Sequence, residues 1–293
     1  MNNTMEIRAP GMAGKSGTYD QQGIWLDVPW NDIGRGIDGS TFELDTHNFP
    51  NFSAASSNPT IAAASAINPL GHAVYYDTAD VIGKAADEPF GAAKLVGAAT
   101  DNNEQWVQAG GNLGGMIVLN APSAATLPNV AFDACFQTST IAANVRSLFI
   151  GCGEEGMAVA NTQVDDTGAM ADKDWIGFRT LHGAAAENAT LQFAFKKAGQ
   201  TLVTVIAALK TLVADTIYRV GFTHLPGVHP ETRRITVWLD NVRQLVGVTN
   251  AQMAAATFPA GEEMAPLFGG KAGAATASTI KIHRVKAAMW KNP

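Results

Sequence analysis

Residues 9–16 read APGMAGKS, a relaxed form of the P-loop pattern that binds phosphate. Such a loop works when a strand precedes it and a helix follows it, so that backbone amides and the helix N-terminus surround the phosphate. Only eight residues precede this segment, and the Gly-Thr-Tyr-Asp run at residues 17–20 does not begin a helical pattern. The sequence therefore predicts no nucleotide site here, and we interpret residues 9–16 as part of a flexible N-terminal segment.

Paired carboxylates would be needed for glycoside hydrolysis, with one on each side of the scissile bond. Glu154 and Glu155 are adjacent in the chain, so in a strand their side chains would point to opposite faces. Glu262 and Glu263 have the same arrangement. No Gly-x-Ser-x-Gly elbow is present to position a serine nucleophile. We expect no enzyme, unless folding assembles a carboxylate pair from distant positions.

An acidic segment, DDTGAMADKD, could supply oxygen ligands to a metal ion. Its carboxylates are Asp165, Asp166, Asp172 and Asp174. The segment lacks the EF-hand pattern, which favours a solvated acidic loop over a calcium site, although the metal alternative stays open. His224 and His229 flank a Pro/Gly loop, and this spacing indicates a polar loop more than a metal site. We therefore expect no bound metal and no cofactor.

The chain has two cysteines, Cys135 and Cys152, and each lies in an apolar run. Free cysteine is among the most buried residue types, so this pattern predicts two buried thiols. A disulfide would require the two strands to be neighbours.

Composition excludes several classes of partner. Charged residues make up 16% of the chain, against about 25% in typical soluble domains. The net charge is −6 and no basic run occurs, which argues against nucleic acid binding. No apolar stretch reaches the 18 residues of a membrane span, and the N-terminus lacks the pattern of a signal peptide. We expect no membrane partner and synthesis as a soluble protein in a cytoplasm.

Two regions of the chain differ in composition and in hydrophobic patterning. Residues 1–95 are rich in Gly, Ser, Asn and Pro with short apolar pieces, which predicts an extended, mostly irregular N-terminal arm with a few short strands. A small β subdomain is the weaker alternative. Residues 96–293 carry recurring strand-like segments separated by turns, which predicts an all-β antiparallel β-sandwich.

The segments that predict strands in this second region are 116–119, 129–138, 147–152, 191–196, 202–207, 216–223, 234–239 and 279–287. Over 129–138, Phe132, Ala134 and Phe136 alternate with Asp133 and polar neighbours, which places one face of that strand in the core. Residues 203–213 fit either a strand or a helix, and the Val, Thr and Ile of the first half favour a strand. Residues 250–256 predict two helical turns capped by Asn250.

From residue 177 to the end, the sequence resembles the concanavalin A-like (laminin G-like) jelly roll. Residues 215–222 read DTIYRVGF, residues 235–242 read ITVWLDNV and residues 280–285 read IKIHRV. In that fold a Tyr-Arg-Leu-Gly-Phe strand pairs with a strand that ends in a tight turn. Asp240 and Asn241 stand where Asp-Gly is commoner, and Asn tolerates the same left-handed conformation. The resemblance implies a fold, not a function.

The layout of the whole chain resembles virion structural proteins of tailed bacteriophages, in which an irregular arm precedes a jelly roll. This resemblance implies a capsid decoration or cement protein that is made in the host cytoplasm and binds the major capsid protein lattice on the capsid surface. It also implies self-association, as a homotrimer. Low charge and the lack of catalytic motifs agree with this hypothesis.

Aromatic residues suggest where a partner would bind. Trp25 and Trp30 lie in the arm, where they would either anchor into a partner surface or pack onto the chain's own sandwich; both alternatives stay open. The alternative function is a carbohydrate-binding β-sandwich module on a phage fibre or another virion surface component. Trp238 is the candidate glycan contact, because alternation places it opposite the core-facing Val237 and Leu239.

Overall fold

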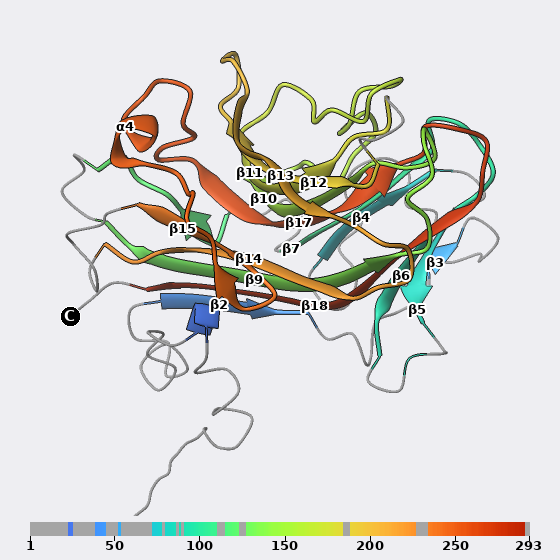
Figure 1. Cartoon of the computed structure of the whole chain (residues 1–293), viewed down its shortest axis with the longest axis horizontal. Coiled ribbons are helices and arrows are strands. Elements are labelled where there is room, and N and C mark those ends of the chain that lie inside the picture. The colour runs from blue at the N-terminus through green and yellow to red at the C-terminus, as the bar shows by residue number, and fades with distance from the viewer. Residues whose placement is uncertain are drawn as a thin grey trace, which may run out of the picture.

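The structure is a computed structural model, and it describes residues 23–25, 39–44, 52–53, 72–77, 80–85, 88, 91–109, 115–122, 127–183, 188–226 and 234–290. Over these residues two antiparallel sheets pack face to face (Figure 1). This arrangement confirms the predicted all-β antiparallel sandwich.

The eight-stranded sheet has the order β13-β12-β11-β10-β17-β7-β4, and β8 pairs with β17 beside this path. Its strands are β4 (His72–Tyr76), β7 (Glu104–Ala109), β8 (Ile117–Val118), β10 (Leu148–Glu154), β11 (Trp175–Thr180), β12 (Thr190–Lys196), β13 (Val203–Thr211) and β17 (Glu263–Lys271).

The nine-stranded sheet has the order β16-β15-β14-β9-β18-β6-β5-β3, and β2 pairs with β18 beside this path. Its strands are β2 (Gly39–Glu43), β3 (Phe52–Ser53), β5 (Val81–Lys84), β6 (Ala93–Gly97), β9 (Asn129–Thr138), β14 (Tyr218–His224), β15 (Ile235–Leu239), β16 (Val242–Arg243) and β18 (Ser278–Trp290).

Strands with clear alternation were predicted well, and strands without it were missed. β9 spans the predicted residues 129–138, and residues 203–211 form a strand and not a helix. β17 was missed because Pro266, Gly269 and Gly270 resemble turn signals, although the strand lies in the middle of the sheet. β11 was missed as well, because it is buried along its whole length and has no polar face to alternate with.

The N-terminal region contributes to both sheets. β4 pairs with β7, whereas β2 and β6 pair with different halves of β18. The predicted boundary between residues 95 and 96 falls inside β6. Strands from the predicted arm are therefore integral to the sandwich, while ordering of the rest of that arm on a partner stays a prediction.

Two local predictions can be compared with the backbone. Asp240 and Asn241 form the two-residue turn between β15 and β16 with φ of 50° and 65°, which confirms the predicted left-handed turn. The helix α4 (Asn250–Met253) is shorter than predicted, and its N-cap is Thr249 and not Asn250. Thr249 Oγ1 accepts from Gln252 N at 3.2 Å, and Gln252 Oε1 accepts from Thr249 N at 2.9 Å. This reciprocal capping box makes Thr249 the better cap.

Aromatic rings join the two sheets in the core. The rings of Phe132 and Phe222, from β9 and β14, stack at 5.2 Å between centroids. Phe222 also meets Phe193 of the facing sheet at 5.9 Å, and Phe193 meets Phe178 at 4.9 Å. Burial of such rings supplies a large share of the hydrophobic stabilisation of a sandwich.

The outer face of the eight-stranded sheet is covered by a strap, residues 155–174, which connects β10 to β11. Met157 and Met170 of the strap pack with Trp106, Phe149 and Trp175 in a second buried cluster outside the main core. Because the strap covers this face, β7 is buried along its whole length.

A polar contact fixes the strap to the sheet. Lys271 Nζ lies 2.6 Å from Asp165 Oδ1 and donates to Gln163 O at 3.0 Å. The same ammonium lies 3.6 Å from the buried Glu104. A buried lysine needs such partners, since an unpaired charge away from water is costly.

Candidate ligand-binding site

The outer face of the nine-stranded sheet carries a row of polar side chains across three strands. Lys281 of β18 pairs in register with Gln137 of β9 on one side and with Lys94 of β6 on the other. Their core-facing neighbours, including Phe136 and Ile280, are fully buried, so alternation turns this row toward solvent.

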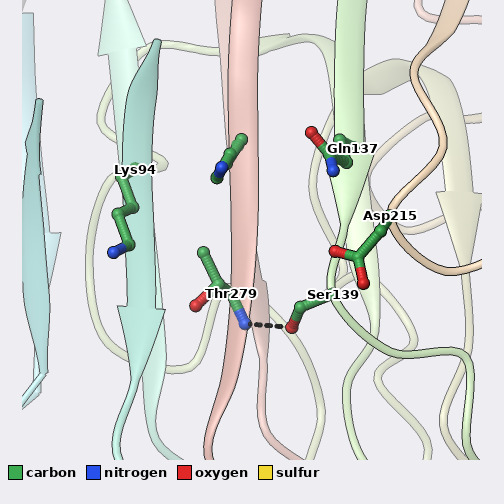
Figure 2. Close-up of a pocket in the computed structure, with 6 residues that line it drawn as sticks. Lys94, Gln137, Ser139, Asp215 and Thr279 are labelled. Carbon is green, nitrogen blue, oxygen red and sulfur yellow. Dashed lines mark hydrogen bonds between the residues drawn. The ribbon is translucent and has the colours of Figure 1, made fainter. Parts of the chain in front are cut away.

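A second row completes a polar depression lined by Lys94, Gln137, Ser139, Asp215, Thr279 and Lys281. Its volume is about 150 Å³. Figure 2 shows Lys94 on one side of β18, and Gln137, Ser139 and Asp215 on the other. Asp215 reaches this position from the turn before β14, which is fixed by Asp215 N donating to Thr138 O at 2.8 Å.

Hydrogen bonds hold two of the lining groups in place. Thr279 N donates to Ser139 Oγ at 2.8 Å, as the dashed line in Figure 2 shows. His283 Nε2 lies 3.2 Å from Gln137 Oε1. Burial lowers the pKa of His283, and the nearby Lys281 lowers it further against the opposing effect of Glu88. The imidazole is therefore neutral near pH 7, and its donation to Oε1 leaves the amide nitrogen of Gln137 able to donate to a ligand.

The two lysines differ in their surroundings. Lys281 Nζ forms an ion pair with Glu88 Oε1 at 2.6 Å. Among the described residues, no carboxylate lies within ion-pair distance of Lys94. Lys94 is thus the uncompensated positive charge of the polar depression, and Asp215 is the carboxylate in its lining.

Farther along the same face, Asp133 is the centre of a buried ionic cluster. Arg219 binds its carboxylate through two nitrogens, at 2.7 and 2.9 Å, and Arg284 Nη2 lies 3.3 Å away. Trp25 Nε1 donates to the same carboxylate at 2.9 Å, and Lys286 Nζ lies 5.3 Å from the centre of the Trp25 ring. This cluster is saturated by its own partners and leaves little capacity for a ligand.

The aromatic residues predicted as contacts have different positions. Trp25, in the 3-10 helix η1 (Gly23–Trp25), is fully buried against the chain's own sandwich with Ile24 and Trp290. In the structure, Trp25 therefore packs onto the chain's own sandwich, which is one of the two alternatives. Trp30 lies outside the described residues.

Trp238 is half-buried, packs against the Trp25 cluster and donates to Thr223 Oγ1 at 3.0 Å. In the register it is level with Gly221 and Asp133, four residues along β9 from Gln137. At about 3.3 Å per residue, this separation places Trp238 outside the polar depression. Glycan contact by Trp238 stays a prediction.

The acidic segment is engaged by neighbours. Besides the Asp165–Lys271 pair, Asp172 lies 3.0 Å from Lys196 Nζ, and Asp174 Oδ1 accepts from Ala198 N at 2.7 Å. Among the described residues, no three His, Cys, Asp or Glu side chains are grouped to hold a metal. His224 lies at the buried end of β14, whereas His229 is outside the described residues.

Folding does bring carboxylates from distant positions near one another at the strand ends. Burial raises the pKa of Glu262, and the negative charges of Asp174 and Glu154 raise it further. Glu154 is already occupied, because Lys173 Nζ lies 2.7 Å from one oxygen and Asp174 N donates to the other at 2.8 Å. None of these three residues lines the polar depression.

Only part of the polar depression could be predicted from the sequence. Alternation in β9 predicts an outward-facing Gln137, but Lys94 and Lys281 lie far apart in the chain and carry no motif. Their strands are neighbours only because β18 pairs with both β6 and β9.

Taken together, the order and pairing of these strands define a concanavalin A-like sandwich. Comparison of the sequence with protein-family models and with curated proteins gives no match. No helix in the described residues is long and apolar enough to cross a membrane.

Several solved structures are similar to this chain. A structure of peanut lectin with a nine-residue peptide is 11% identical, covers 87% of this chain and 99% of its own, and has a TM-score of 0.54. A protein of unknown function from Shewanella oneidensis MR-1 is 15% identical over 90% of this chain and 94% of its own, with a TM-score of 0.47. The carbohydrate recognition domain of Emp47p is 10% identical over 79% and 95%, with a TM-score of 0.46. The likeness to peanut lectin shows the fold.

Proposed function

We propose that this chain is a non-catalytic carbohydrate-binding module, and that it binds glycan in the polar depression on the outer face of the nine-stranded sheet. The observation that carries the proposal is the lining itself. An amide, two hydroxyls, two ammonium groups and one carboxylate converge there on a space of about 150 Å³.

The chemistry of the lining supports a sugar ligand. Each hydroxyl of a sugar both donates and accepts hydrogen bonds, so a site for it needs donors and acceptors side by side. Asp215 and Ser139 offer acceptors, while Lys94 and the amide nitrogen of Gln137 offer donors. The volume is below the roughly 300 Å³ at which pockets for drug-sized ligands begin, so the depression suits one sugar ring of an exposed chain. The fold shared with a lectin is consistent with this use.

The lining also supports binding without hydrolysis. A glycosidase needs two carboxylates on opposite sides of the scissile bond, separated by roughly 5–10 Å. In the polar depression Asp215 has no such partner among the described residues, because it is the one carboxylate in the lining.

Glycan binding can be tested directly with Asp215→Asn and Gln137→Ala variants. Asn keeps the left-handed backbone of Asp215, which has a φ of 55°, so the first variant should fold. We expect glycans captured on an array to bind the wild type and to lose at least about tenfold in affinity with either variant, measured by calorimetry. Asp172→Asn is the matched control, since Asp172 is an exposed carboxylate outside the polar depression. Failure to bind any glycan would reject the proposal.

Capsid decoration stays a prediction from the sequence, together with the major capsid protein as partner, trimeric self-association and location on a virion. Trp25, one of the two residues predicted as anchors, is buried on the chain's own sandwich. Cosedimentation of the purified protein with undecorated phage heads would test this hypothesis.

A further inference from the structure

We infer that the sugar bound in the polar depression is acidic, with a carboxylate or sulfate group that pairs with Lys94. This inference rests on the proposed carbohydrate-binding function and specifies its ligand class. It starts from the separation of charge in the lining, where Lys94 and Asp215 lie on opposite sides of β18 (Figure 2).

The register of the sheet fixes the position of the positive charge. Lys281 has the position between Lys94 and Gln137 in the row that crosses β6, β18 and β9. Its ammonium is neutralised by Glu88, whose Oε1 lies 2.6 Å from Lys281 Nζ. Lys94 has no such carboxylate among the described residues, so an anionic ligand would supply its counter-charge.

The opposite side of the depression has the complementary chemistry. Asp215 is exposed and can accept hydrogen bonds from neutral hydroxyl groups, but its negative charge repels an anionic group. Figure 2 shows Asp215 and Ser139 separated from Lys94 by β18. A ligand with an anionic end and a hydroxyl-bearing end therefore has one favourable orientation, with the anion at Lys94 and the hydroxyls at Asp215 and Ser139.

A uronic or sialic acid ring has this polarity, and so does a sulfated sugar. A neutral sugar would leave Lys94 unpaired, while a free anion such as phosphate would leave Asp215 without a partner. Because Lys94 is only half-buried, its attraction is expected to weaken as salt is added.

The experiment uses the full chain on an array that contains uronate, sialylated, sulfated and neutral glycans. Bound acidic glycans are then compared by calorimetry with their carboxyl-reduced or desulfated counterparts, which keep the same ring and linkage. We expect the acidic member of each pair to bind at least about tenfold more tightly at low salt. Binding to carboxylates alone or to sulfates alone would identify which of the two anions the site takes.

The variant Lys94→Met removes the charge and keeps most of the side chain. It should abolish the difference between acidic and neutral members, while Asp215→Asn should weaken binding of both. Lys210→Met, an exposed lysine of β13 on the other sheet, is the matched control and should change neither. If Lys94→Met lowers the melting temperature, Lys94→Arg should restore the acidic preference.

The outcomes separate this inference from the proposed function. Equal or tighter binding of neutral glycans, or an acidic preference that survives in Lys94→Met, would overturn the acidic ligand and leave carbohydrate binding intact. Absence of binding to every glycan would overturn both.

Discussion

At the scale of single residues, Asp133 is a fully buried carboxylate on the outer face of the nine-stranded sheet. Its side chain has no exposed area, and three groups from distant parts of the chain converge on it: Trp25, Arg219 and Arg284. A carboxylate in such a position compensates the positive charges around it. Removing that charge leaves the arginines close together without a counter-ion.

We therefore expect Asp133→Asn to lower the free energy of unfolding by about 3 kcal/mol, measured by chemical denaturation. The Asp172→Asn variant is the control, because Asp172 forms an exposed ion pair with Lys196 and should have no measurable effect. If Asp133→Asn is as stable as the wild type, water must solvate the Arg219 guanidinium well enough to replace the carboxylate.

The cysteines allow a second prediction at this scale. Both are free thiols, but only Cys152 is buried as predicted, whereas Cys135 is half-buried. They lie on different sheets, in β9 and β10, so the disulfide alternative is wrong. Burial and then the charge of Asp133 raise the pKa of Cys135 to about 11, and burial raises the pKa of Cys152 still more. Both should stay protonated at pH 8.

Because the thiolate is the reactive form, a disulfide reagent such as DTNB should label the native protein only slowly at pH 8. Two equivalents should react quickly after unfolding in guanidinium chloride. Rapid release of one equivalent from the native protein would show that the Cys135 thiol is far more accessible and acidic than its surroundings indicate.

At the scale of elements, the contact between η1 and the nine-stranded sheet depends on a glycine. Gly221 of β14 makes room for this contact, because a Cβ at that position would lie 2.5 Å from Ile24 Cδ1 and would also clash with the carbonyl of Phe132. This gives a physical reason for glycine within the YRVGF pattern, which the sequence identified only as a fold signature.

We expect Trp25→Ala to destabilise the isolated protein by about 3 kcal/mol, because it empties a fully buried aromatic site. Trp25→Phe is the matched variant, since it retains most of the buried aromatic area and loses the hydrogen bond to Asp133. It should cost less, about 1 kcal/mol. Unchanged stability of Trp25→Ala in denaturant titrations would favour the other alternative, in which Trp25 anchors a partner.

The turn between β15 and β16 gives another test at this scale. Both of its central residues have positive φ, which Asn tolerates and most side chains do not. Asn241→Ala should therefore destabilise the protein by about 1 kcal/mol, whereas Asn241→Gly should be neutral or slightly stabilising. Equal thermal stability of the two variants would contradict the turn geometry.

At the scale of the whole molecule, the sequence predicted the fold class but not which strands are neighbours in each sheet. Alternation in β9 was readable because one of its faces is solvated at Gln137. In β7 it was not, because the strap buries Glu104, Trp106 and Gln108 on the outer face as well. The polar depression was missed for a related reason: the register of β6, β18 and β9 depends on packing of the complete sandwich, and no local pattern encodes it.

The buried histidines His72 and His224 make the free energy of unfolding depend on pH. Burial lowers the pKa of His72 and of His224 from 6.5 to about 4. Below pH 6.5 the unfolded chain takes up these protons while the folded protein does not, so the unfolded state binds more protons. The free energy of unfolding should therefore fall as the pH drops from about 6.5 toward about 4, by at most about 3 kcal/mol per histidine.

Two buried carboxylates oppose this loss at the acid end. Burial raises the pKa of Asp80 and of Glu104, so the folded protein takes up their protons before the unfolded chain does. The clearest measurement is thus urea denaturation between about pH 6.5 and about pH 5 on the wild type and a His224→Gln variant side by side, because both proteins contain the same two carboxylates. His224→Gln cannot titrate and should make the dependence shallower than in the wild type. The same pH dependence in the wild type and in His224→Gln would mean that the imidazole of His224 accepts a proton in the folded protein, and that the end of β14 opens to water.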